Sequence, residues 1–369
     1  MDFDYKKHTV DFYILRAFWA AFAFIFSLFI AIVFVVVTFE ELDAFGEERV
    51  TFGLGLTYVF LRMPHELVKA TPMIVVLSMV IALGNLIRHK EMLMLYIAGY
   101  TPIRLCAPLV MFLIVLLAGL FWINENLCGP FSARAQFLME TRIKENRDGL
   151  TGEAGVWIYG EGNRIFRAQT FYPISNRIDG LSVFVYQGQN QRLSEWIEAD
   201  SAVWNPQNGK WILNDVTTHK LQDNGSFITR KNESLDYDLD RSPEDFGAVT
   251  QDIEQMSHGD LKKLVDSIRE AGENPWMYLP DLRIKEAFPF AVFFLGMLTY
   301  AMMLFFSSGG KASGLGLGLV AVILYFMALS LGKSFARANA IPPWAGAWTP
   351  NIICFLLTAY FFNRLRQDI

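Results

Sequence analysis

The sequence offers few side chains at spacings that support catalysis or metal binding. His65 and Glu66 stand in PHELVK, which lacks the second histidine of an H-E-x-x-H zinc site. The cysteines Cys106, Cys128 and Cys354 lie in or beside apolar segments, where they are expected as small apolar fillers rather than disulfide partners or zinc ligands. The hydrophilic middle of the chain shows neither a nucleophile elbow nor a convincing carboxylate pair. We therefore expect no catalytic residues and no metal site.

Two glycine-rich stretches invite comparison with nucleotide-binding loops. The stretch SSGGKAS around Lys311 lacks the G-x-x-x-x-G-K-[ST] spacing that lets backbone amides and a lysine cradle phosphates. Gly314, Gly316 and Gly318 lack the third spacing of a dinucleotide fingerprint and lie in an apolar segment, where small residues let helices approach one another. The sequence predicts no nucleotide site and no cofactor in this chain.

One polar connector does carry an interpretable pattern. Residues 88–102, RHKEMLMLYIAGYTP, join two apolar runs as a short helix that ends at Gly99 and the threonine-proline pair behind it. On a 3.6-residue period, Glu91, Leu95 and Ala98 share a face. One carboxylate beside an apolar stripe is typical of a helix that docks into a groove on a soluble partner. Periodicity favours equally a connector that lies on lipid headgroups.

The segments that flank this connector are apolar enough to cross a membrane. The 369 residues are 53% hydrophobic with a mean hydropathy of +0.29, too apolar for one soluble core. The first apolar run, residues 17–38, is uncharged and reaches about 33 Å as a helix. We expect it to be a retained membrane span rather than a cleaved signal peptide. Six transmembrane helices are expected, at 17–38, 67–87, 105–123, 288–306, 314–332 and 344–362.

Charge in the short connections predicts the orientation. Most Lys and Arg residues of the short connections fall on one side of the membrane, at Lys6, Lys7, Arg16, Arg88, Lys90, Arg104, Lys311, Arg364 and Arg366. The other side has Arg49, Arg62, Lys333 and Arg337. The imbalance puts both termini in the cytoplasm and the long middle segment outside. A net charge of −5 without a basic run excludes a nucleic-acid partner.

The middle segment reads as an inserted all-β domain. Alternating aromatic and β-branched residues, broken by EGN, QGQN, PQNG and DNG, predict antiparallel strands in a small sandwich, jelly roll or barrel. Its tryptophans are expected as core anchors, at Trp157, Trp196, Trp204 and Trp211. An amphipathic helix follows, capped by Ser257, with one apolar face formed by Leu261, Leu264, Val265 and Ile268. We expect the domains 1–124, 125–287 and 288–369.

With these features in place, the chain resembles the lipopolysaccharide export permease family, LptF and LptG. The likeness covers essentially the whole chain, including NLIRHKEMLMLYIAGYTP, GVWIYGEGNRIFRAQ, GKWILNDV and RIKEAFPFAVFFLGMLTYAM. Its most specific piece is the pattern formed by Arg88, Glu91, Ala98 and Gly99. The stretch IPPWAGAWTP before the last span is more similar to LptG than to LptF.

The resemblance implies an inner-membrane ATP-binding-cassette exporter. In this family, two permease chains and a dimer of separate cytoplasmic ATPase subunits extract lipopolysaccharide and pass it to a periplasmic bridge of jelly-roll domains. The second permease is a paralogue or an identical chain. The inserted domain is then periplasmic and jelly-roll-like. The helix at about 88–99, with Arg88, Glu91, Leu95, Ala98 and Gly99, is then the coupling helix held by the ATPase.

The substrate side departs from the family pattern. Similar family members often place lysines at the outer end of the first span to meet lipid phosphates, whereas this chain has Thr38, Glu40 and Glu41. In the exporter that the resemblance implies, a lipid-binding cavity lies between the two permease chains. Cations near the expected outer side of this cavity are the candidate substitutes, because a partly desolvated phosphate favours them. These are Arg62, Lys69 and Arg134. Headgroup snorkelling for Lys69 and ordinary ion pairing for the two arginines are the alternatives.

Two other classes of function compete with the exporter. A membrane-anchored scaffold or sensor would use the outer domain to bind a partner and would need no ATPase on its cytoplasmic face. An intramembrane enzyme is disfavoured by the absent ligand and nucleophile spacings.

Overall fold

The computed structural model describes residues 2–40, 52–138, 153–160, 164–172, 176–187, 192–206, 208–222, 227–239, 253, 256–270, 274–307 and 313–367. The chain divides into two compact units. The helical unit comprises Met1–Leu42, Val59–Ser132 and Trp276–Ile369, and the sheet unit comprises Asp43–Tyr58 and Ala133–Pro275. The β domain is therefore an insertion into a helical membrane protein, as the sequence predicts.

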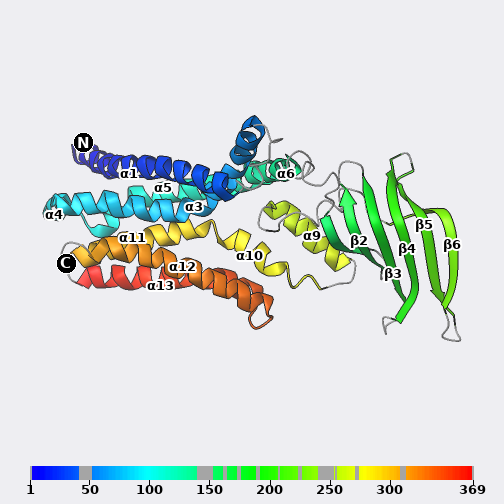
Figure 1. The fold of residues 1–369 in the computed structure, drawn as a ribbon. Coiled ribbons are helices and arrows are strands. Elements are labelled where there is room, and N and C mark those ends of the chain that lie inside the picture. The colour runs from blue at the N-terminus through cyan, green and yellow to red at the C-terminus, as the bar shows by residue number, and fades with distance from the viewer. Residues whose placement is uncertain are drawn as a thin grey trace. The chain divides into compact units, whose positions relative to one another are not determined.

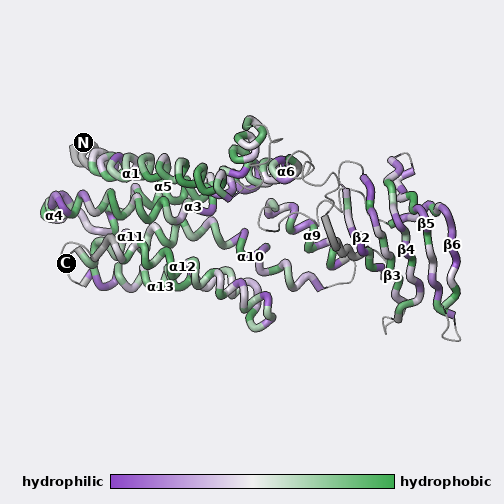
Figure 2. The backbone as a smooth tube through the Cα atoms, in the orientation of Figure 1, coloured by the Kyte–Doolittle hydropathy of each residue, from purple (hydrophilic) through white to green (hydrophobic). Residues whose placement is uncertain are grey.

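Long and short helices build the described part of the helical unit (Figure 1). They are α1 (Asp2–Glu40), α3 (Phe52–Arg88), α4 (Glu91–Ile97), α5 (Pro102–Ile123), α10 (Leu279–Ala287), α11 (Phe290–Ser307), α12 (Ser313–Arg337) and α13 (Pro343–Gln367). The start of α1, the short helix α4 and the end of α13 lie at the same end of this bundle (Figure 1). Hydrophobic residues follow the helices for most of their length (Figure 2).

Five helices among the described residues are long and apolar enough to cross a membrane. They are Thr9–Glu40, Phe52–Arg88, Pro102–Gln136, Gly316–Arg337 and Pro343–Arg366. The pair Leu279–Ala287 and Phe290–Phe306, bent by 50°, supplies a sixth span when counted as one. The expected membrane protein of six helices is confirmed, although α3 begins 15 residues before the predicted span, at Phe52 rather than at 67.

The bend between α10 and α11 has an identifiable cause and a polar support. Pro289 stands between the two helices and has no N–H to donate, so the helical hydrogen-bond ladder is interrupted there. The amide of Asn351 in α13 donates to the carbonyl oxygen of Ala287 at 2.9 Å. The hydroxyl of Tyr325 in α12 donates to the side-chain oxygen of Asn351 at 3.0 Å. The carbonyl at the end of α10 is thereby satisfied inside an apolar bundle.

Close helix packing depends on particular glycines. A Cβ on Gly318 in α12 would meet Val80 of α3 at 2.8 Å, which confirms the packing role predicted for this glycine. Gly316 has open space around it, and the side-chain surroundings of Gly314 lie outside the described part. The closest approach is between Gly332 of α12 and Gly346 of α13, whose backbones leave no room for a side chain. The buried cysteines Cys106, Cys128 and Cys354 are free thiols.

Within the described ranges, the sheet unit has six antiparallel strands that lie side by side in chain order. They are β1 (Glu153–Gly160), β2 (Arg164–Tyr172), β3 (Arg177–Gln187), β4 (Arg192–Asn205), β5 (Lys210–Leu221) and β6 (Phe227–Tyr237). Trp211 is fully buried in the core of this sheet, and Trp204 packs against that core. Trp196 instead stacks between Phe184 and His219 on neighbouring strands. The side chain of Trp157 lies outside the described part of the structure.

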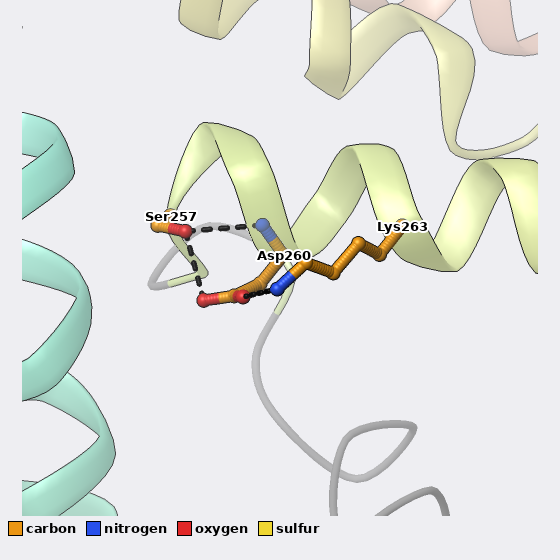
Figure 3. A network of polar contacts seen from close by, with 3 residues as sticks. All are labelled: Ser257, Asp260 and Lys263. Carbon is orange, nitrogen blue, oxygen red and sulfur yellow. Dashed lines mark hydrogen bonds and ion pairs between the residues drawn. The ribbon is translucent and has the colours of Figure 1, made fainter.

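The helix after the sheet, α9 (His258–Glu270), is capped as predicted. The Ser257 hydroxyl accepts a hydrogen bond from the backbone N–H of Asp260 at 3.1 Å and donates to that residue's carboxylate at 2.8 Å (Figure 3). Lys263 lies 3.5 Å from the same carboxylate. Leu261 and Val265 are buried and Leu264 and Ile268 are partly buried, which confirms the predicted apolar face.

Candidate functional site

The connector between α3 and α5 is held between two left-handed residues. Lys90, before α4, has a φ of 58°, and Gly99, after it, has a φ of 87°. The Thr101 hydroxyl then accepts from the backbone N–H of Arg104 at 3.3 Å and so caps α5, which begins at Pro102. The predicted helix is present, but it runs from Glu91 to Ile97, and Arg88 belongs to the last turn of α3.

The exposed face of α4 differs from the predicted one. Met92 is buried and Leu95 packs against the core of the bundle. The exposed apolar side chains are Leu93, Met94 and Ile97, at 53%, 68% and 75% exposure. Ala98 and Gly99 are also exposed. The expectation that Leu95 faces outward is wrong, because the helix turns its Met92–Leu95 side towards the apolar bundle, which periodicity alone could not reveal.

Glu91 is already engaged within the chain. The hydroxyl of Tyr13 in α1 donates to Oε2 of Glu91 at 2.5 Å. Two residues earlier on α1, the carboxylate of Asp11 accepts hydrogen bonds from both terminal nitrogens of Arg104, at 2.8 and 2.6 Å. A fork-to-fork pair of this kind fixes orientation as well as distance. Both ends of the connector are therefore attached to the start of α1.

Deeper contacts hold the other side of the connector. The Tyr300 hydroxyl in α11 donates to the carbonyl oxygen of Pro102 at 2.8 Å inside the bundle. Tyr96 is partly buried in α4, and burial raises the pKa of its phenol to about 12. The Tyr96 phenol therefore stays neutral and packs against the core of the bundle, while the opposite side of the connector is apolar and exposed.

The candidate phosphate-binding cations fall into two places. Arg62 of α3 lies 3.7 Å from Glu40 and 3.9 Å from Glu66, and Lys69 lies 3.7 Å from the same Glu66. Glu66 therefore joins Arg62 and Lys69 into one cluster beside the end of α1. Arg134 belongs to the other compact unit, on the exposed surface of α6 (Gly129–Leu138). The acidic stretch after Glu40 lies outside the described residues.

A further charged cluster was not anticipated from the sequence. Asp281 of α10 is 4% exposed and lies 2.7 Å from both Lys333 and Arg337 of α12. The indole N–H of Trp276 donates to the carbonyl oxygen of Ala336 at 2.8 Å beside it. Asp11, Tyr13 and Asp281 carry no local signal, because their partners stand 93, 78 and 52–56 residues away.

Among the described residues, no group of three or more His, Cys, Asp or Glu side chains is placed to hold a metal ion. His65 is buried within α3 rather than turned to an open site. The exposed apolar face of α4 is attached through polar contacts to a bundle of membrane helices.

The comparisons with known proteins agree with this architecture. The permease protein LptG of the lipopolysaccharide export system of Haemophilus influenzae is 21% identical over 371 aligned residues, covering 98% of this chain and 99% of that protein. The protein of the same name from Escherichia coli K12 is 20% identical and covers 92% of this chain and 96% of its own length. The family model for the lipopolysaccharide export system permease LptF/LptG matches residues 12–364. The chain thus belongs to the LptF/LptG family of lipopolysaccharide export permeases.

Proposed function

We propose that this chain is the permease subunit of an ATP-binding-cassette exporter that extracts lipopolysaccharide from the inner membrane and delivers it to a periplasmic jelly-roll bridge. The observation that carries the proposal is the family match across residues 12–364, which takes in both the helical unit and the inserted sheet. Membership of this family makes the chain a multi-pass transport permease rather than an enzyme. The energy must then come from a separate ATPase dimer.

The surface of α4 is the proposed docking point for that ATPase. Leu93, Met94 and Ile97 form an exposed apolar face on a short helix whose flanking turns are tight. A helix of this kind suits a groove on a partner, since its i, i+3 and i+4 residues serve as anchors. Glu91 stands at the start of the same helix. In the proposed orientation this end of the bundle, with both chain ends, faces the cytoplasm.

In the proposed lipid site, the phosphates bind Arg62 and Lys69 in competition with carboxylates. Arg62 and Lys69 share Glu66, and Arg62 also faces Glu40, so a phosphate must compete with carboxylates for both cations. Such a site would hold the lipid only transiently, which suits a carrier. Arg134, on the exposed surface of α6, is proposed as a separate contact.

Co-purification from mild detergent tests the transporter proposal. We expect an ATPase subunit and a second permease, identical or paralogous, to accompany the native chain. Ile97→Glu is expected to lower the bound ATPase tenfold or more, because it places a charge in the centre of the apolar face. Phe227→Glu, at a half-exposed position of β6, is the matched control and should leave the amount unchanged. A native chain without any ATPase would favour a membrane-anchored scaffold.

Photocrosslinking tests the lipid contacts. A photoreactive residue placed at Arg62, Lys69 or Arg134 in living cells should capture lipopolysaccharide. The exposed position Tyr360 on α13 serves as the control for random lipid capture. Positions that capture no more lipopolysaccharide than Tyr360 are removed from the proposed site.

A further inference from the structure

Two side-chain links attach the start of α1 to both ends of the α4 connector. Tyr13 donates to Glu91 at the first residue of α4, and Asp11 pairs with Arg104 in the first turn of α5. The residues concerned are 78 and 93 positions apart, so neither link is a by-product of local helix geometry. Each link joins side chains of two different helices, and together they bracket α4.

The remainder of α1 is held differently. Beyond these links, Phe18, Trp19 and Phe22 surround Phe112 of α5 in edge-to-face contacts. The most apolar window of the α1 span is only 17% buried, the lowest share among the candidate spans of the described residues, whereas the corresponding window of α3 is 61% buried. The two directional links to α4 and α5 thus start from one turn of a helix whose most apolar window is buried only to a small share within this chain.

The exposed face of α4 is distinct from the side that carries these links. Leu93, Met94 and Ile97 are exposed, whereas Glu91 and Leu95 face α1 and the bundle core. Lys90 and Gly99 provide tight left-handed turns on either side, so α4 is a short rigid piece between two corners. A partner that displaces the exposed face of α4 would therefore act on α1 through the Tyr13–Glu91 hydrogen bond as well as on the backbone.

We propose that Tyr13 and Asp11 are positioning residues that pass the displacement of α4 to α1, so that the first helix moves with the connector during transport. This inference rests on the proposed exporter function. Glu91 then acts inwards, on α1, in addition to any contact with the motor subunit. The Asp11–Arg104 pair keeps α1 in register with the start of α5 while the Tyr13–Glu91 bond carries the displacement.

The test uses the complete complex with its ATPase in lipopolysaccharide-containing proteoliposomes. Tyr13→Phe removes one hydroxyl and keeps the ring. We expect bound ATPase and ATP hydrolysis to stay within twofold of the native complex, while the lipopolysaccharide extracted per ATP hydrolysed falls at least fivefold. Tyr360→Phe, an exposed tyrosine of α13, is the matched control and should leave this ratio unchanged.

The second link is tested by charge reversal. Asp11→Arg should lower the same ratio, and the combination with Arg104→Asp should restore it at least partly, because the reversed pair re-forms the bond. A direct readout is the distance between spin labels at Trp19→Cys and Ile352→Cys, both exposed positions of the helical unit. This distance should change on ATP binding in the native background and should stay fixed when Tyr13→Phe is present.

The outcomes separate the two proposals. Loss of the ATPase from the native complex would overturn the exporter function itself. A native complex that extracts lipid, together with Tyr13→Phe and charge-reversed variants that keep the native ratio and distance change, overturns only the role of α1. A Tyr13→Phe variant that loses ATPase binding in proportion to extraction also overturns it, because the hydroxyl would then serve docking alone.

Discussion

At the residue scale, two buried polar side chains of the bundle, Asp281 and Asn351, have their partners on other helices. The carboxylate of Asp281 forms ion pairs with Lys333 and Arg337. The side chain of Asn351 accepts a hydrogen bond from Tyr325 and donates one to the carbonyl oxygen at the end of α10. In an apolar environment an unsatisfied polar group costs several kcal/mol, so each such contact restricts how the helices can be arranged. These contacts define which helix faces meet, whereas apolar side chains fill the space between them.

Replacement of Asp281 by alanine tests this at one position. The substitution leaves two cations beside α10 without their buried carboxylate, and we expect a loss of about 3 kcal/mol in the free energy of unfolding. The measurement is a reversible SDS titration of the purified protein. Glu286→Ala in the same helix removes a more exposed carboxylate that pairs with Arg283, and should cost less than about 1 kcal/mol. Equal losses for both would contradict a special role for Asp281.

The residue types of the candidate site were recognisable from the sequence, but their contacts were not. Gly99 and Ser257 stand where local patterns placed them, because left-handed turns and caps depend on neighbours in the chain. The partner of Glu91 was not predictable, since Tyr13 is 78 residues away. Whether Arg62, Lys69 and Arg134 meet lipid stays a prediction.

At the element scale, the boundaries of the helices differ from the predicted spans for a physical reason. The predicted span in α3 omits the region of Arg62, His65 and Glu66, because charged residues lower its hydropathy. In the structure the helix continues through that region, where Arg62 and Lys69 pair with glutamates. Ion pairs reduce the cost of charge at the edge of an apolar bundle, so composition alone underestimates the length of the helix.

The contact between α12 and α13 gives a prediction at this scale. Gly332→Ala places a methyl group against the backbone of Gly346, and the helices must separate to admit it. We expect a loss of about 1–3 kcal/mol, the range for overpacked interiors. Gly316→Ala, where nothing lies within 4 Å, is the control and should be neutral or stabilising by up to about 1 kcal/mol. Thermal unfolding in detergent compares them, and an undisturbed Gly332→Ala protein would contradict the close contact.

At the scale of the whole molecule, one chain combines two units whose surfaces differ in polarity. The helical unit exposes apolar side chains along α1, α5, α12 and α13, as expected of surfaces that face lipid or another membrane subunit. The sheet unit has a buried apolar core of its own, and both hydrophilic and hydrophobic residues occur along its strands (Figure 2). The two kinds of packing follow from the two kinds of sequence pattern.

Accessibility labelling tests the proposed orientation. The native cysteines are buried, so a membrane-impermeant maleimide should report introduced cysteines against a low background. Phe227→Cys in β6 should be labelled in intact spheroplasts, and Arg366→Cys at the end of α13 should be labelled in inverted membrane vesicles only. The short loops predict this orientation through their excess of Lys and Arg on one side. Labelling of both positions from the same side would contradict it.

The sequence by itself determined the class of protein, the approximate membrane spans, the inserted strands and the capped helix, because hydropathy, periodicity and turn signals act over a few neighbouring residues. The resemblance to the family came from its motifs and not from these local signals. Only the tertiary structure decided which face of α4 is exposed, that Glu91 is held by Tyr13, and that Asp281 is neutralised by α12. These contacts join residues more than 50 positions apart. They depend on how whole helices pack, which no local pattern specifies.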